Sequence, residues 1–166
     1  MSTLEILQFP DPRLLTVAKP IAQVDERIKD IAARMLETMY ESNGVGLAAT
    51  QVNVHERMFV MDTTEERNQP LVLINPELTW VSEEKTCDDE GCLSIPGIYD
   101  SVERHASVHV KAQDEHGQWR TIEATGLQAV CIQHEMDHLM GKLFVDYLSP
   151  LKRNRIKSKM LKRAKG

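Results

Sequence analysis

The sequence lacks the features that would place it in a membrane or outside the cell. No apolar run approaches the roughly 18 residues that a membrane-spanning helix requires. The first residues, Met1 to Glu5, show neither the basic start nor the apolar core of a secretion signal. Only three cysteines occur, Cys87, Cys92 and Cys131, an odd number that argues against a disulfide framework. We therefore expect a cytoplasmic protein with reduced thiols and no membrane partner.

The chain also lacks internal repeats, low-complexity stretches and any credible linker. Its 166 residues, of which 42% are apolar and 27% charged, therefore suit a single globular domain. Acidic residues are missing from residues 152–166, which hold eight of the 20 basic residues. The remainder carries 12 basic and 25 acidic residues. We predict one domain over residues 1–150 and a basic C-terminal helix or tail over residues 151–166.

Hydrophobic periodicity predicts two helices inside the domain. Residues 25–42 form an amphipathic pattern with Asp25 as N-cap, and residues 125–140 form a second helix. Thr125 and Gln128 fit a capping box, and Gly141 fits a C-terminal stop. Strand-like segments occupy residues 57–62, 70–75, 77–82, 104–114 and 118–124, with a hairpin turn at 116–117. Strands grouped before a late helix indicate an α+β fold.

The strongest chemical signal is the run from His134 to His138, with Glu135 beside the first histidine. Positions four apart on a helix lie one above the other, so two imidazoles can bind one metal ion. The neighbouring glutamate can then reach a water molecule on that ion. The alternative is an amphipathic helix that carries two unrelated histidines. The apolar face around this run disfavours that alternative, because unpaired histidines are costly there.

A catalytic site of this kind usually needs a third protein ligand. Phe144 stands where one class of zinc protease places a third histidine, and no Glu or His follows His138. Cys131 lies seven residues before His138, a rise of about 10 Å, which is too far for one ion on a straight helix. Cys87 and Cys92 remain. We favour Cys92, because the preceding glycine allows the backbone to approach another element closely.

Three segments together resemble the motifs of the peptide deformylase family, in the same order and over nearly the whole chain. The segments are Gly44-Val45-Gly46-Leu47-Ala48-Ala49-Thr50-Gln51, Glu90-Gly91-Cys92-Leu93-Ser94 and Gln133-His134-Glu135-Met136-Asp137-His138. The resemblance implies an enzyme that hydrolyses the formyl group from the N-terminal formyl-methionine of nascent polypeptides. It implies antiparallel sheets packed around the motif helix. It also implies metal ligands at Cys92, His134 and His138, with one Fe²⁺ in the cell and Ni²⁺ or Zn²⁺ possible in purified protein.

The same resemblance assigns roles around the metal. Glu135 would move the water proton, and the Gln51 amide with the backbone N–H of Leu93 would stabilise the oxyanion. Without the family pattern, a surface amide would be the better interpretation of Gln51. Glu90 and Arg104 could orient the peptide or the motif loops. The candidate substrate pocket contains small and apolar residues for which ordinary core packing is the alternative, namely Gly44, Val45, Gly46, Leu127, Val130 and Cys131.

The basic segment 152–166 allows two interpretations, a solubilising helix or a helix that docks on the RNA-rich surface of the ribosome. Family members dock through such a helix, so we favour docking, and we expect no DNA partner. Two alternative functions for the whole chain are another H-E-x-x-H metalloprotease and a non-catalytic ribosome-binding module with a structural metal. Metal-dependent release of formate from a formyl-peptide would distinguish the deformylase from both.

Overall fold

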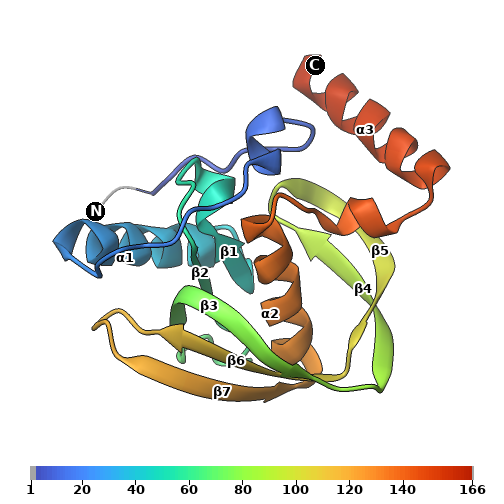
Figure 1. The fold of residues 1–166 in the computed structure, drawn as a ribbon. Helices are drawn as coiled ribbons and strands as arrows, with labels where there is room; N and C mark the ends of the chain where they lie inside the picture. The colour runs from blue at the N-terminus through green and yellow to red at the C-terminus, as the bar shows by residue number, and fades with distance from the viewer. Residues whose placement is uncertain (1–2, 166) are drawn as a thin grey trace.

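The computed structural model describes residues 3–165 and consists of two antiparallel sheets, three α-helices and three short 3₁₀ helices (Figure 1). The α-helices are α1 (Glu26–Glu41), α2 (Gly126–Leu139) and α3 (Pro150–Lys165). The 3₁₀ helices are η1 (Pro12–Leu15), η2 (Ala49–Val52) and η3 (Phe144–Tyr147). The strands are β1 (Gly46–Ala48), β2 (Met58–Met61), β3 (Leu71–Val81), β4 (Lys85–Cys92), β5 (Ile95–His105), β6 (Ser107–Gln113) and β7 (Trp119–Thr125).

The larger sheet has five strands in the order β1-β2-β3-β6-β7, and β4 and β5 form a separate hairpin. Figure 1 shows α2 between the large sheet and this hairpin, with α1 and α3 on opposite sides of the molecule. Helix α2 contacts strands of both sheets. This arrangement confirms the predicted α+β fold around the motif helix. Among the described residues, none of the helices combines the length and apolar character needed to cross a membrane.

Helix α1 forms where the sequence predicted it. The side chain of Asp25 caps its first turn by accepting a hydrogen bond from the backbone N–H of Ile28, at 3.0 Å. Its apolar stripe packs against β1, β2 and η2 in one core cluster, in which Ile28, Met35 and Met39 are fully buried. The helix ends at Glu41, Asn43 adopts a positive φ of 58°, and the chain then enters β1, which contacts α2.

Helix α2 is also confirmed, but its predicted capping box is wrong. The side chain of Thr125 makes no capping hydrogen bond, because Thr125 is the last residue of β7 and is paired there with Ser107. The C-terminal end follows the prediction, since Gly141 has a φ of +79° directly after the last turn. A Cβ atom at residue 141 would collide with the carbonyl oxygen of Leu15. The end of α2 is therefore packed directly on the backbone of η1.

The strand predictions need three corrections. Segments 70–75 and 77–82 are one strand, β3, because a register shift after Ile74 accommodates Pro76 without ending the pairing with β6. The predicted strand 104–114 is instead the end of β5 and the whole of β6, with Ala106 between them. The β4–β5 hairpin as a whole was not predicted, although it carries Cys92. Its acidic segment Asp88-Asp89-Glu90 is atypical of strands.

Candidate metal centre

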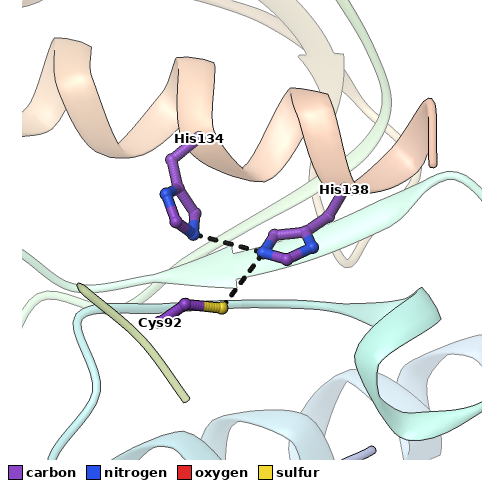
Figure 2. Close-up of side chains that lie close together, drawn as sticks. All are labelled: Cys92, His134 and His138. Carbon is purple, nitrogen blue, oxygen red and sulfur yellow. Dashed lines mark hydrogen bonds between the residues drawn. The ribbon is translucent and has the colours of Figure 1, made fainter. Parts of the chain in front are cut away.

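Three potential ligand atoms converge where the β4–β5 hairpin meets α2. The Sγ of Cys92 and one ring nitrogen each from His134 and His138 lie within 4.8 Å of one another. The two Nε2 atoms are 3.2 Å apart, and the Cys92 Sγ is 3.4 Å from the Nε2 of His138. Figure 2 shows both rings projecting from α2 toward the sulfur on the hairpin. The structure thus brings together the three residues that the resemblance named as ligands.

The donor set fits a divalent first-row metal ion. Two imidazoles and one thiolate suit zinc, iron(II) or nickel, whereas magnesium and calcium prefer oxygen ligands. His138 is fully buried, and its Nδ1 has no hydrogen-bond partner among the described residues. Two buried imidazoles can share only one hydrogen bond between their facing nitrogens. An ion held by both Nε2 atoms would satisfy the ring nitrogens that the protein leaves facing each other.

A buried ionic network orients the first histidine. The Nδ1 of His134 lies 2.9 Å from an oxygen of Glu90, which leaves the Nε2 free to face the centre. Arg104 donates two hydrogen bonds of 2.8 Å to Glu90 and one of 2.6 Å to Asp137. Tyr147 donates to the same Asp137 oxygen at 2.8 Å. Burial alone would raise the pKa of Glu90, but its hydrogen bonds with Arg104 and His134 hold that pKa below its usual range.

Glu135 is buried beside this centre and faces the first motif. Only 3% of the residue is exposed, and its Oε1 has no partner in the described part of the chain. Burial raises the pKa of Glu135 to about 7. A Cβ atom at residue 46 would lie 2.5 Å from its Oε2, so only glycine leaves room there. The position of this carboxyl group and its raised pKa therefore suit it to gain or lose a proton near neutral pH.

Gln51 is not a surface amide, because only 1% of the residue is exposed. Its Oε1 accepts a hydrogen bond of 2.9 Å from the N–H of Ala48, so the NH₂ end faces the opposite way. The Nε2 donates to the Oγ of Ser94 at 3.0 Å and lies 3.4 Å from the Cys92 Sγ. Ser94 is a contact that the sequence analysis missed. Its place two residues after Cys92, inside the second motif, was the available signal.

A cavity of about 620 Å³ opens onto the centre. Arg104 does not line it and instead supports Glu90, whereas Glu90 itself reaches the cavity wall. Tyr99 also lines the cavity, although the sequence analysis gave it no role. Every other residue expected near the substrate lines the cavity, namely Gly44, Val45, Gly46, Gln51, Leu93, Leu127, Val130 and Cys131.

Neither of the other two cysteines belongs to the group of candidate ligands. Helix spacing had argued against Cys131 only, and had left Cys87 as an alternative to Cys92. Cys87 is exposed on β4, away from the centre. Cys131 is buried in the cavity wall, and its Sγ lies 3.8 Å from the carbonyl oxygen of Val45. Burial raises the pKa of the Cys131 thiol well above its usual value, which keeps it protonated.

Comparisons with known proteins agree with this geometry. A family model described as polypeptide deformylase matches residues 3–154. Peptide deformylase 1 of Ralstonia nicotianae is 60% identical over 162 residues, which cover 98% of this chain and 96% of that protein. The peptide deformylase of Cellvibrio japonicus is 57% identical over 166 residues, covering 100% of this chain and 98% of the other.

Solved structures give the same result. The peptide deformylase of Ehrlichia chaffeensis in complex with actinonin superimposes with a TM-score of 0.95 and 40% identity, over 98% of each chain. The peptide deformylase of Legionella pneumophila gives a TM-score of 0.93 and 44% identity, over 98% of this chain and 96% of that chain.

Proposed function

This chain belongs to the polypeptide deformylase family, and on that premise we propose how its own residues divide the work of the reaction. It is a metal-dependent hydrolase that removes the formyl group from the N-terminus of nascent polypeptides and releases formate. The observation that carries the assignment of roles is the convergence of one sulfur and two imidazole nitrogens beside the buried carboxyl group of Glu135.

Cys92, His134 and His138 would hold one divalent ion. When bound, such an ion supplies Lewis acidity and makes a water molecule acidic enough to act as a nucleophile near neutral pH. The ion in the cell would be Fe²⁺, with Ni²⁺ or Zn²⁺ in protein purified in air, since a soft thiolate ligand suits iron(II) but is open to oxidation. Metal analysis of anaerobically purified protein tests this, and iron-loaded activity that survives aerobic storage would contradict it.

Glu135 would accept the proton of the attacking water and later deliver a proton to the leaving amine. Its burial supports this role, because a carboxyl group with a pKa of about 7 can do both at ordinary pH. The leaving group is the α-amine of methionine, which departs readily only when it is protonated. Glu90 and Arg104 would act indirectly, by holding the His134 ring in the orientation that a metal requires.

Negative charge grows on the formyl oxygen during attack, and two donors would stabilise it. The Gln51 amide has its oxygen fixed by Ala48, so its N–H groups face the region of Cys92 and Ser94. The backbone N–H of Leu93 would be the second donor. Loss of one such donor typically costs 10²–10³ in kcat. We therefore expect Gln51→Ala to lower kcat by about that factor, without loss of bound metal.

The methionine side chain would occupy the apolar part of the cavity. Val45, Leu127, Val130 and Cys131 line it, and the backbone of Gly44 and Gly46 forms the adjoining wall. An unbranched thioether chain suits such a slot, because it can follow an irregular apolar surface. A competition assay between formyl-Met-Ala-Ser and formyl-Asp-Ala-Ser measures this selectivity, which should strongly favour methionine.

Formate release from formyl-Met-Ala-Ser, measured with and without a chelator, tests the assignment as a whole. A deformylase releases formate and loses that activity when the metal is removed. An H-E-x-x-H protease would instead cleave internal peptide bonds of unformylated peptides. A closed structural metal site, with four protein ligands, would release nothing.

Helix α3 supports a second proposal, that the enzyme docks on ribosomal RNA. Arg155, Lys159 and Lys162 share one shallow surface groove on this helix, away from its buried face. Cationic side chains like these can contact RNA phosphates. Such contacts weaken as the salt concentration rises, because counterions are released on binding. Reversing these three charges to Glu should weaken salt-dependent co-sedimentation with ribosomes and leave formyl-Met-Ala-Ser turnover unchanged. The control reverses Lys19 and Lys142, which are exposed outside the helix.

Deletion of residues 152–166 is the coarser form of this experiment. It should also leave turnover of the short substrate intact and weaken co-sedimentation. Ribosome binding that is unchanged in the charge-reversed enzyme would remove the docking proposal and leave the deformylase assignment untouched.

A further inference from the structure

One wall of the substrate cavity is held from behind. Segment 43–46 joins α1 to β1 and lines the cavity. The carbonyl oxygen of Gly44 accepts a hydrogen bond of 2.5 Å from the Nη2 of Arg67. The next carbonyl, that of Val45, accepts one of 2.8 Å from the backbone N–H of Asp62. Both donors belong to the loop between β2 and β3, which does not itself line the cavity.

The group that donates to Gly44 is itself tightly placed. The Nη1 of Arg67 lies 3.4 Å from the Asp62 carbonyl, and its guanidinium lies 5.0 Å from the centroid of the Tyr40 ring. The carboxylate of Asp62 is nearly inaccessible and accepts hydrogen bonds from Thr64, Gln69 and the Tyr40 hydroxyl. Although burial on its own raises the pKa of Asp62, these hydrogen bonds lower it to about 2. The carboxylate of Asp62 therefore stays ionised throughout the neutral pH range.

The wall has no room for a side chain at Gly44 or at Gly46. A Cβ atom at Gly46 would lie 2.5 Å from the Glu135 carboxylate and 2.8 Å from the Cys131 sulfur. A Cβ atom at Gly44 would lie 2.6 Å from a methyl carbon of Leu93. The backbone at Gly44 and Gly46 therefore lies directly against Leu93, Glu135 and Cys131. A small displacement of this segment would change the width of the cavity.

We propose that Arg67 is a positioning residue for the formylated peptide, which fixes the Gly44 carbonyl and thereby sets the cavity wall formed by residues 43–46. The proposal rests on the deformylase reaction proposed for this site. Arg67 is absent from the cavity lining and from the contacts of Glu135 and the candidate ligands. It acts through the backbone of the first motif and takes no part in the chemistry.

Replacement of the guanidinium by an apolar side chain of similar length tests this. Arg67→Met removes the donors to Gly44 and keeps the aliphatic stem. A looser wall weakens substrate and transition state equally, so KM for formyl-Met-Ala-Ser should rise about tenfold while kcat stays within about twofold. Arg67→Lys restores one charged donor, and its KM should return to within about threefold of the parent enzyme.

A control variant separates positioning from stability. Arg57→Met is the matched control, because Arg57 is also half-buried and donates to a backbone carbonyl, that of Pro76, at 2.6 Å. Neither Arg57 nor Pro76 lines the cavity. Arg57→Met should lower Tm and leave KM unchanged.

The proposal is overturned if the change in KM parallels the change in Tm across these variants and does not depend on the hydrogen bond between Arg67 and Gly44. This means that Arg67→Met and Arg57→Met lower Tm to a similar extent and change KM to a similar extent. If Arg67→Met does not fold, Arg67→Gln replaces it under the same criteria, with an expected rise in KM of about threefold. Formate release by the parent enzyme is measured first, so failure of the deformylase assignment is distinct from failure of the role of Arg67.

Discussion

The two helices that follow the large sheet have opposite relations to the rest of the protein. In α2, nine of 14 residues are buried, and they include both histidines and Glu135. In α3, two of 16 residues are buried, Ile156 and Met160. A helix that is buried along most of its length has its position fixed by packing, so its polar groups can be placed accurately. A helix attached by one narrow stripe leaves its charged groups facing outward.

The polar contacts of the two helices show the same difference. On α2, Gln133 bonds both the N–H and the carbonyl of His105, at 3.0 and 2.8 Å, and Asp137 pairs with the buried Arg104. On α3, Lys152 reaches Asp100 at 3.3 Å and Arg163 donates to the Pro96 carbonyl at 2.6 Å, both at the surface. The contacts of α2 therefore support chemistry, and those of α3 only attach the helix.

The largest effect should come from α2, at Glu135. Glu135→Gln removes the group that moves protons and keeps its shape, so kcat should fall about 10²–10⁴-fold. Tm should be unchanged or higher, because burying a neutral amide costs less than burying a carboxylate. Formate release and thermal unfolding measure the two quantities. Activity within tenfold of the parent enzyme would exclude Glu135 as the acid–base group.

Arg104→Met should give the next largest effect, on stability. It leaves the buried carboxylate of Glu90 and the partly buried carboxylate of Asp137 without their cation, which should cost about 3–5 kcal/mol in the free energy of unfolding. Metal affinity should fall about 10–100-fold, because the His134 ring loses its support. Urea unfolding and zinc titration measure these changes. The matched change on α3 is Arg153→Met, which breaks an exposed pair with Asp146 and should cost at most about 1 kcal/mol.

Met160→Ala tests whether α3 is attached only by its buried stripe. The side chain is 3% exposed, and its truncation should cost about 2 kcal/mol. This loss should appear as faster hydrogen exchange within residues 150–165, while exchange in α2 and turnover of a short formyl-peptide stay the same. Leu161→Ala is the control, because Leu161 is 44% exposed. Faster exchange in α2 would show that the two helices unfold together.

The smallest effect is expected on the outward face of α3. Lys159→Gln should change the free energy of unfolding by less than about 0.5 kcal/mol and leave turnover unchanged, because the side chain is exposed and has no ion pair among the described contacts. Denaturant unfolding measures this. A larger loss would mean that the outward charges of α3 contribute to the fold.

The sequence predicted the elements whose signals are local. The Asp25 cap and the apolar stripe gave α1, and Gly141 gave the end of α2. The capping box at Thr125 failed because strand pairing had already placed that residue. Strand β4 was not predicted, because its acidic residues and Gly91 are atypical of strands. It is stabilised by pairing with β5 and by the ion pair between Glu90 and Arg104.

In the candidate site, too, the sequence predicted the residues with local signals and missed the contacts between residues far apart in the chain. The spacing of His134, Glu135 and His138 already indicates a metal site on one helix. Spacing alone left Cys87 and Cys92 as alternatives. The glycine before Cys92 favoured that residue, and the family resemblance then named it as the ligand. The contacts between Arg104 and Asp137 and between Gln51 and Ser94 join residues 33 and 43 positions apart. No local pattern encodes such pairs, since they form only when the hairpin packs against α2 and η2.

The contact between Gly141, at the end of α2, and Leu15 of η1 limits the substitutions that this chain can accept. Residue 141 needs a left-handed backbone, and it also has the Leu15 carbonyl where a side chain would begin. Either requirement favours glycine, and together they exclude every other amino acid unless η1 moves. Residue 141 should therefore remain glycine in every lineage that keeps the N-terminal segment against helix α2.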